Sequence, residues 1–156
     1  MVHRTYLGLR GRDAAIEAFE ELKPYANELL ALRSECRFGS LDHKALGVAL
    51  DGLQTAAYHF TGRPHFYLEV ETNFPTQRSD NGRLSDRAEA IGAFKGLTPY
   101  VERLRDLQQR CRPFGRDYLA LGIALQSLET AAFHFTREEA FYGAKGDSAG
   151  PIRAAF

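Results

Sequence analysis

The sequence has no excess charge of either sign and no long apolar run. Its 156 residues include 20 Lys plus Arg and 20 Asp plus Glu, with no block of basic residues. This balance gives no electrostatic reason to expect nucleic acid or an anionic membrane as a partner. No apolar segment approaches the roughly 18 residues that a membrane-spanning helix needs, so we expect none.

Cysteines are few, and an export signal is not evident. The N-terminal segment MVHRTYLGLRGR carries charges but has no apolar h-region, so we expect no signal peptide. We therefore expect the only two cysteines, Cys36 and Cys111, to be reduced thiols in a cytoplasmic protein. Each stands at the end of an apolar helical pattern, and we interpret both as buried small residues rather than reactive thiols.

What the sequence does contain is an internal repeat. Residues 14–67 align with residues 89–142 at a constant offset of 75, without a gap, and 26 of the 54 pairs are identical. A repeat of this kind is typical of a unit that buries its apolar face against a second copy. We predict a single domain, residues 1–156, with repeats at about 12–67 and 87–142, a linker at 68–86 and a tail at 143–156.

Each repeat is predicted to form a helical hairpin. Apolar residues recur every three or four positions from Ala14 to Cys36, and a second helical segment follows. Asp42 and Asp117 are plausible N-caps for the second segments. Pro24 and Pro99 interrupt the first segments, and their missing N–H donors predict a kink or break at each.

The ends of the second segments differ between the copies. The first copy has Gly62 after the pattern, a common helix stop. The second copy has Arg137 there instead, so we predict that its helix continues to about Tyr142 and Gly143. Between the repeats, HFYLEVET alternates apolar and polar residues and could pair with the N-terminal TYLGL as a minor two-stranded β ribbon.

The second helix of each repeat carries a large and a small apolar stripe. In the first copy the large residues are Leu46, Leu50, Leu53, Ala57 and Phe60. The small stripe is Ala45, Ala49, Gly52 and Ala56, repeated as Ala120, Ala124, Ser127 and Ala131. Small residues let two helix backbones approach closely, so the two second helices are expected to pack together. The fold class is then mainly α, a pseudo-twofold bundle of four principal helices; a homodimer through the same stripe is the competing arrangement.

The repeated TAAYHFT and TAAFHFT place a histidine at the edge of the small stripe. His59 and His134, with Thr55 and Thr130, are therefore half-buried polar groups that need partners. The two histidines could together hold a metal or a haem, contact a ligand in a pocket, or each make a structural hydrogen bond.

The expected geometry favours the structural hydrogen bonds. If the two helices run antiparallel and cross near Gly52, the two imidazoles lie roughly 20 Å apart, which is too far for one metal ion. The same arrangement brings each histidine to the start of the opposite helix. We therefore predict that His59 pairs with Asp117 and that His134 pairs with Asp42.

Few other residues suggest chemistry. His134 and Glu138 have the i,i+4 spacing of a helical acid–base pair, but only in the second repeat. Tyr25 and Tyr100 could point into a pocket between helices with Tyr58, Tyr118 and Phe133, although such residues are more often core aromatics. We expect a non-enzymatic binding or interaction module without a cofactor, and the alternative is a metal- or haem-binding bundle using His59 and His134. The candidate ligand-binding residues are His59, His134, Thr55, Thr130, Tyr25 and Tyr100.

Overall fold

A computed structural model describes residues 11–67, 84 and 86–143 of the chain. These residues form six α-helices and, among themselves, no strand, so the prediction of a mainly α protein is confirmed. The helices are α1 (Arg12–Glu21), α2 (Lys23–Ser34), α3 (Leu41–Thr61), α4 (Arg87–Lys95), α5 (Thr98–Gln109) and α6 (Arg116–Thr136).

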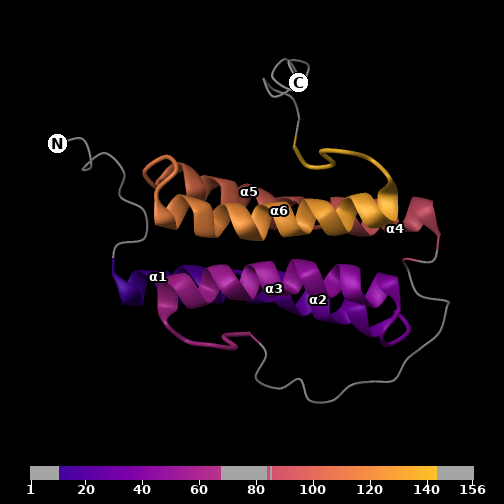
Figure 1. Cartoon of the computed structure of the whole chain (residues 1–156), viewed down its shortest axis with the longest axis horizontal. Helices are drawn as coiled ribbons and strands as arrows, with labels where there is room; N and C mark the ends of the chain where they lie inside the picture. Colours follow the sequence, from indigo (N-terminus) through magenta and orange to yellow (C-terminus); the bar gives the residue numbers. More distant parts are fainter. Residues whose placement is uncertain (1–10, 68–83, 85, 144–156) are drawn as a thin grey trace.

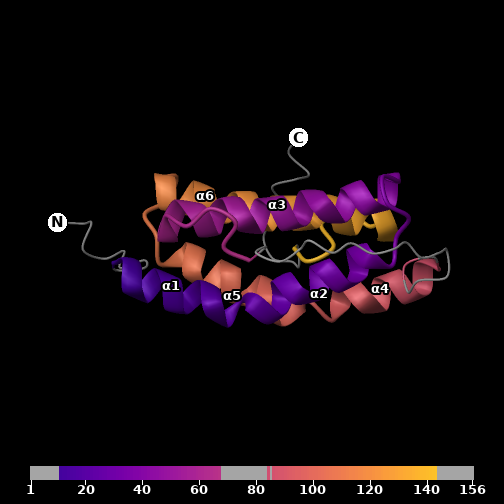
Figure 2. The same cartoon turned by 90° about the horizontal axis from the view of Figure 1, so that it is seen from below.

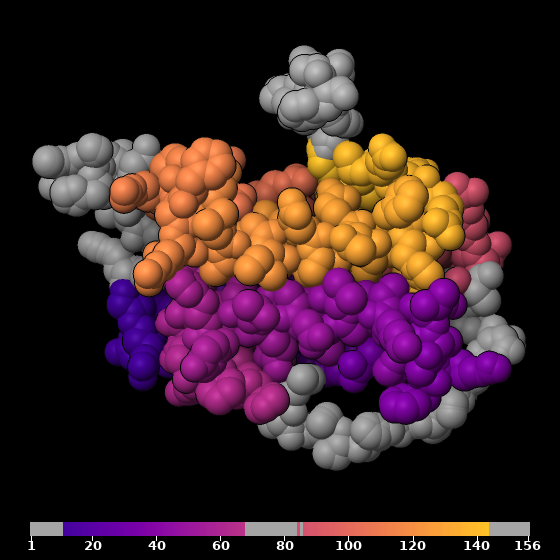
Figure 3. Space-filling view, in the orientation of Figure 1, coloured from indigo at the N-terminus to yellow at the C-terminus, as the bar shows by residue number. Residues whose placement is uncertain are grey.

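The helices lie in two layers. The long helices α3 and α6 lie side by side in one layer, and the four shorter helices form the other (Figures 1 and 2). The chain runs through α3 and α6 in opposite directions, so that each begins beside the end of the other. Figure 3 shows the outer face of this pair, on which the two helices meet along a continuous seam.

Both first segments are broken next to their prolines, as predicted. α1 ends at Glu21 and α2 begins at Lys23, with Pro24 in its first turn. The second copy has the same break, between α4 and α5, with Pro99 in the first turn of α5. Proline is tolerated there because the first N–H groups of a helix have no intrahelical partner.

The small residues of α3 and α6 allow a close contact between these two helices. A Cβ atom added at Gly52 would lie 1.9 Å from Oγ of Ser127 and 3.0 Å from the carbonyl oxygen of Ile123. A side chain larger than hydrogen at Gly52 would therefore force Ser127 to move or the two backbones to separate. The predicted crossing near Gly52 and Ser127 is confirmed, and it is made within one chain.

The large stripe of α3 packs on the helices of the other layer. Leu46, Leu50 and Leu53 are buried, and the ring of Phe60 stacks on Phe19 of α1 at 5.6 Å. The corresponding pair in the second half, Phe94 and Phe135, has the same 5.6 Å separation. Each long helix thus has two packing partners, its antiparallel neighbour and the shorter helices of its own half.

The predicted N-caps of the long helices are wrong. Ser40 caps α3, since its side chain accepts a hydrogen bond from the N–H of His43, and Gly115 precedes α6. Asp42 and Asp117 lie inside the first turns instead. A carboxylate in the first turn still favours the positive end of the helix dipole, and its side chain is free to reach across to the other helix.

The predicted extension of α6 to Tyr142 is also wrong, because the helix ends at Thr136. Arg137 takes the left-handed conformation, with φ of 65°, that Gly62 takes at the end of α3. The N–H of Glu138 then donates to the hydroxyl of Thr136 at 3.2 Å. The guanidinium of Arg137 lies 5.5 Å from the centre of the Phe133 ring, a contact that stabilises this turn.

Two further expectations concern strands and membranes. Residues 65–67, at the start of HFYLEVET, form turns and bends rather than a strand, while the rest of that segment and TYLGL lie outside the described residues. Among the helices that the structure describes, none is both long and apolar enough to cross a bilayer.

Candidate functional site

The structure places each candidate histidine against an aspartate of the opposite long helix. Nε2 of His59 lies 2.8 Å from Oδ1 of Asp117, and Nε2 of His134 lies 2.8 Å from Oδ1 of Asp42. Both predicted His–Asp pairs are confirmed. The pairs occupy opposite ends of the antiparallel α3–α6 contact, so the two imidazoles do not share a site.

The histidine pairs have the character of structural contacts. Each imidazole also packs edge-on against the next phenylalanine, His59 on Phe60 at 4.8 Å and His134 on Phe135 at 4.7 Å. One ring nitrogen of each histidine is thus hydrogen-bonded, and each ring also contacts an aromatic neighbour. Thr55 and Thr130, one turn before the histidines, are exposed, and the Thr130 hydroxyl donates to the carbonyl of Gln126 in its own helix.

Tyr25 and Tyr100 are brought together, in the core. Their rings stack at 5.4 Å with an angle of 12°, and Tyr25 is completely buried. The hydroxyl of Tyr25 is buried and has no hydrogen-bond partner among the residues that the structure describes. Burial raises the pKa of this phenol far above its usual value. Of the other aromatics expected beside them, Tyr58 and Phe133 are exposed on the outer face.

Two more buried tyrosines anchor the segments that follow the long helices. The hydroxyl of Tyr67 donates to the carbonyl of Phe19 at 2.6 Å, and that of Tyr142 donates to the carbonyl of Phe94 at 2.6 Å. Burial is the main cause that raises the pKa of both phenols. Because these hydroxyls are buried donors to main-chain carbonyls, they serve the fold rather than proton transfer.

The groups that could hold a metal or act as nucleophiles are dispersed. Within the described ranges, no three His, Cys, Asp or Glu side chains are grouped as a metal site. Cys36 and Cys111 are free thiols in buried positions, as predicted. Burial, and next a nearby aspartate, raises the pKa of each to about 11, which disfavours the reactive thiolate. Glu138 lies beyond the end of α6, so the helical spacing assumed for a His134–Glu138 pair does not exist.

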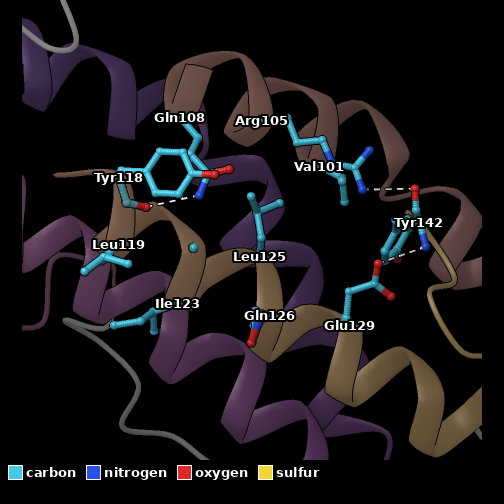
Figure 4. A pocket seen from close by; sticks show the side chains of 11 residues that line it. Val101, Arg105, Gln108, Tyr118, Leu119, Ile123, Leu125, Gln126, Glu129 and Tyr142 are labelled. Carbon is cyan, nitrogen blue, oxygen red and sulfur yellow. Dashed lines mark hydrogen bonds between the residues drawn. The ribbon is translucent and has the colours of Figure 1, made fainter. Parts of the chain in front are cut away.

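A cavity of about 530 Å³ lies on the second half of the molecule, between α5 and α6 (Figure 4). Its apolar lining residues are Val101, Leu119, Ile123 and Leu125. Its polar lining residues are Arg105, Gln108, Tyr118, Gln126 and Glu129. A few polar groups around an apolar floor are typical of small-molecule sites, and the volume falls in their usual range.

Hydrogen bonds hold the polar side chains of the cavity in place. Nη2 of Arg105 donates to the carbonyl of Tyr142 at 3.0 Å, and Nε2 of Gln108 donates to the carbonyl of Tyr118 at 3.1 Å. Oε2 of Glu129 accepts from the N–H groups of Tyr142 and Gly143, both at 3.1 Å. The guanidinium of Arg105, the amide of Gln108 and the carboxylate of Glu129 are therefore held in place before any ligand binds.

The corresponding positions of the first half show which of these residues the fold itself requires. Gln54 stands where the second half has Glu129, and its Oε1 accepts from the N–H of Tyr67 at 3.0 Å. A neutral amide can therefore also supply the acceptor that binds a main-chain N–H of the segment after the long helix. Leu30 stands at the position of Arg105. The packing of the helices therefore requires neither charge.

Sequence reasoning identified only Tyr118 among the residues of this cavity. The signal that could have found the others is the difference between the copies. Arg105 and Glu129 are charged where the first copy has Leu30 and Gln54. Where one repeat has a charged residue and the aligned position of the other repeat is uncharged, the shared fold does not require the charge.

The comparisons with known proteins add no assignment, since no protein-family model, no curated protein and no solved structure matches this chain.

Proposed function

We propose that this protein is a non-enzymatic helical module that binds a small molecule in the cavity between α5 and α6. The observation that carries the proposal is the cavity itself, which combines an apolar floor with polar side chains already held by hydrogen bonds. A preformed site of this kind binds with little ordering cost. Its free thiols, Cys36 and Cys111, suit a cytoplasmic protein.

We further propose that the module consists of two helical hairpins related by a pseudo-twofold axis, derived from one duplicated unit. Helices α1, α2 and α3 begin 75 residues before α4, α5 and α6, respectively. The His–Asp pairs, the tyrosine anchors and the phenylalanine stacks also recur at this offset. In this proposal the first copy keeps a structural role, while the second has diverged to carry the ligand site.

The candidate histidines fit a supporting role in this proposal. Their Nε2 atoms are bound to Asp117 and Asp42 at opposite ends of the α3–α6 contact. A metal or haem bound by both histidines would need those bonds to break and the rings to approach across the length of the pair. No contact in the described part of the chain favours that alternative over the cavity.

A neutral fluorescent probe tests the proposed site. N-phenyl-1-naphthylamine is apolar and uncharged, and its emission rises when it enters an apolar cavity. Ile123→Trp places an indole in the cavity, while Val48→Trp makes the equivalent change in the first half. Both residues are similarly exposed, at 47% and 44%, so the two variants perturb the fold to a similar degree.

We expect wild type and Val48→Trp to bind the probe at one saturable site and Ile123→Trp to bind it at least about fivefold more weakly. Steric blocking of the cavity is the reason. If wild type shows no saturable binding, or if both tryptophan variants lose affinity equally, the proposed site is wrong.

A further inference from the structure

We infer that the ligand of the cavity is a small organic acid, whose anionic group binds Arg105 while its apolar body lies over Ile123 and Leu125. This inference rests on the proposed function and adds the chemical class of the ligand. It follows from three observations: the guanidinium of Arg105 held by a hydrogen bond, the carboxylate of Glu129 already bound to main-chain N–H groups, and the absence of both charges from the equivalent positions of the first half.

Arg105 is the cation of the cavity lining. Its guanidinium has five N–H donors, and the structure assigns one of its terminal nitrogens, Nη2, to the carbonyl of Tyr142. That bond fixes the side chain against the segment after α6 and leaves other donors for a ligand. A guanidinium with two donors side by side matches the geometry of a carboxylate or a sulfonate.

Glu129 does not compete for the same ligand contacts. Its Oε2 accepts from two main-chain N–H groups, and its Oε1 is buried and has no partner within the described ranges of the chain. A ligand cation would therefore have to compete with these two main-chain donors for the carboxylate. A Cβ added at Gly143 would lie 3.6 Å from Oε2 of Glu129 and 3.7 Å from Nη2 of Arg105, so both side chains approach Gly143.

The remaining groups describe the rest of the ligand. Figure 4 shows Arg105 toward Tyr142 and the ring of Tyr118 at the opposite end, with Leu125 and Ile123 below. Gln108 uses its amide N–H for the carbonyl of Tyr118, which leaves its carbonyl oxygen as an acceptor. The site therefore fits a ligand with an acidic group at one end and a flat apolar body.

Two probes that differ only in a sulfonate group, and so in charge, test the inference. 8-Anilinonaphthalene-1-sulfonate carries a sulfonate on the skeleton of N-phenyl-1-naphthylamine. Arg105→Leu introduces the residue that the first half has at this position, so the variant is compatible with the helix packing. Arg110→Leu is the matched control: Arg110 follows α5, pairs with Asp106 at 3.4 Å and does not line the cavity.

We expect wild type to bind the sulfonate probe more tightly than the neutral one. Arg105→Leu is expected to lower the affinity for the sulfonate probe about tenfold, a typical cost for losing a hydrogen bond to a charged group. The affinity for the neutral probe is expected to change less than twofold. Arg110→Leu is expected to leave both affinities unchanged. Arg105→Lys, which keeps the charge but loses the paired donors, is expected to fall between wild type and Arg105→Leu.

The possible failures separate the two proposals. One outcome supports the cavity but contradicts the inference that its ligand is an acid. In that outcome the neutral probe binds and Ile123→Trp blocks it, but the sulfonate probe binds no more tightly than the neutral one, or its affinity is unchanged in Arg105→Leu. If Arg110→Leu weakens the sulfonate probe as much as Arg105→Leu, the binding is adventitious attraction to surface charge and the inference fails. If neither probe binds wild type, both proposals are overturned. Circular dichroism melts confirm that each variant is folded.

Discussion

Nε2 of His59 lies 2.8 Å from Oδ1 of Asp117, and this contact joins the end of one long helix to the start of the other. The equivalent contact between His134 and Asp42, also 2.8 Å, closes the opposite end. The aspartate side chains are about half exposed, at 53% and 51%, so solvent screens both pairs. We expect each pair to contribute about 0.2–1 kcal/mol to the free energy of unfolding, the range of solvent-exposed pairs.

A double-mutant cycle on each pair measures this contribution. His59→Ala and Asp117→Ala, alone and together, give the coupling energy from urea unfolding curves. Because the two pairs lie at opposite ends of the helices, the effects of His59→Ala and His134→Ala are expected to add. A coupling energy near zero in both cycles would mean that the histidines contribute through packing on Phe60 and Phe135 rather than through the aspartates.

Gly52→Ala is expected to destabilise the protein by about 1–3 kcal/mol. The new methyl group would meet Oγ of Ser127 at 1.9 Å and its Cβ at 2.7 Å, so the helices must separate or the serine must move. This cost exceeds the gain of up to about 1 kcal/mol that alanine gives over glycine inside a helix. Thermal and urea unfolding measure the difference.

Two variants serve as controls for the glycine prediction. A Cβ at Gly92, in α4, would meet nothing within 4 Å, so Gly92→Ala is expected to stabilise the protein. Ser127→Gly, added to Gly52→Ala, moves the small residue to the other helix and is expected to recover a large part of the loss. A Gly52→Ala variant as stable as wild type would show that the helices are not in close contact here.

The contact between the long helices could be predicted from the sequence because its causes are local and periodic. The spacing of Ala49, Gly52 and Ala56 places small residues on one face of α3, and the aligned residues of α6 form the matching face. Once the crossing point is known, the rise per residue places His59 near Asp117. Helix geometry therefore converts a pattern of residue sizes into a pair of named contacts.

The end of α6 and the cavity could not be predicted in this way. Arg137 adopts a left-handed conformation that its residue type does not favour, and the contacts around it involve Phe133, Thr136 and the segment that returns to Glu129. The cavity depends on α5 and α6 together, since Arg105 and Glu129 come from different helices and line the same cavity only after folding. Tertiary contacts, not local pattern, decide both features.

The buried thiols make stability depend on pH in the alkaline range. Burial raises the pKa of Cys36 and Cys111 from 9.0 to about 11, so the folded state holds their protons more tightly than the unfolded state. Their contribution to the free energy of unfolding is fully present below pH 9 and is lost as the pH rises toward 11. At pH 10 the loss is roughly 1 kcal/mol per thiol.

Comparison with Cys36→Ala/Cys111→Ala isolates this effect from the buried tyrosines, which are common to both proteins. Urea unfolding at intervals from pH 8 to 10.5 is expected to show a steeper decline of the free energy of unfolding for wild type. Parallel curves would mean that the thiols titrate alike in the folded and unfolded states.

Glu129→Gln is expected to increase the affinity of the cavity for the sulfonate probe. The carboxylate lies near Arg105 and partly offsets its positive charge, while the segment after α6 needs only an acceptor at this position. Gln54 shows that an amide supplies that acceptor, because its Oε1 binds the N–H of Tyr67 at 3.0 Å. Removing one negative charge several ångströms from a bound anion in a water-like medium contributes about 0.5–1 kcal/mol, or about two- to fivefold in affinity.

The reciprocal change, Gln54→Glu, adds a charge to the first half and is expected to leave the affinity of the probe unchanged. The neutral probe is expected to respond to neither variant, and the gain from Glu129→Gln is expected to shrink at high ionic strength. The variant is expected to remain folded, because the side-chain oxygen of a glutamine can accept from the main-chain N–H groups of Tyr142 and Gly143 as Gln54 accepts from Tyr67. If the affinity for the sulfonate probe falls instead, Glu129 holds Arg105 in its binding position, and the loss of that alignment outweighs the loss of the opposing charge.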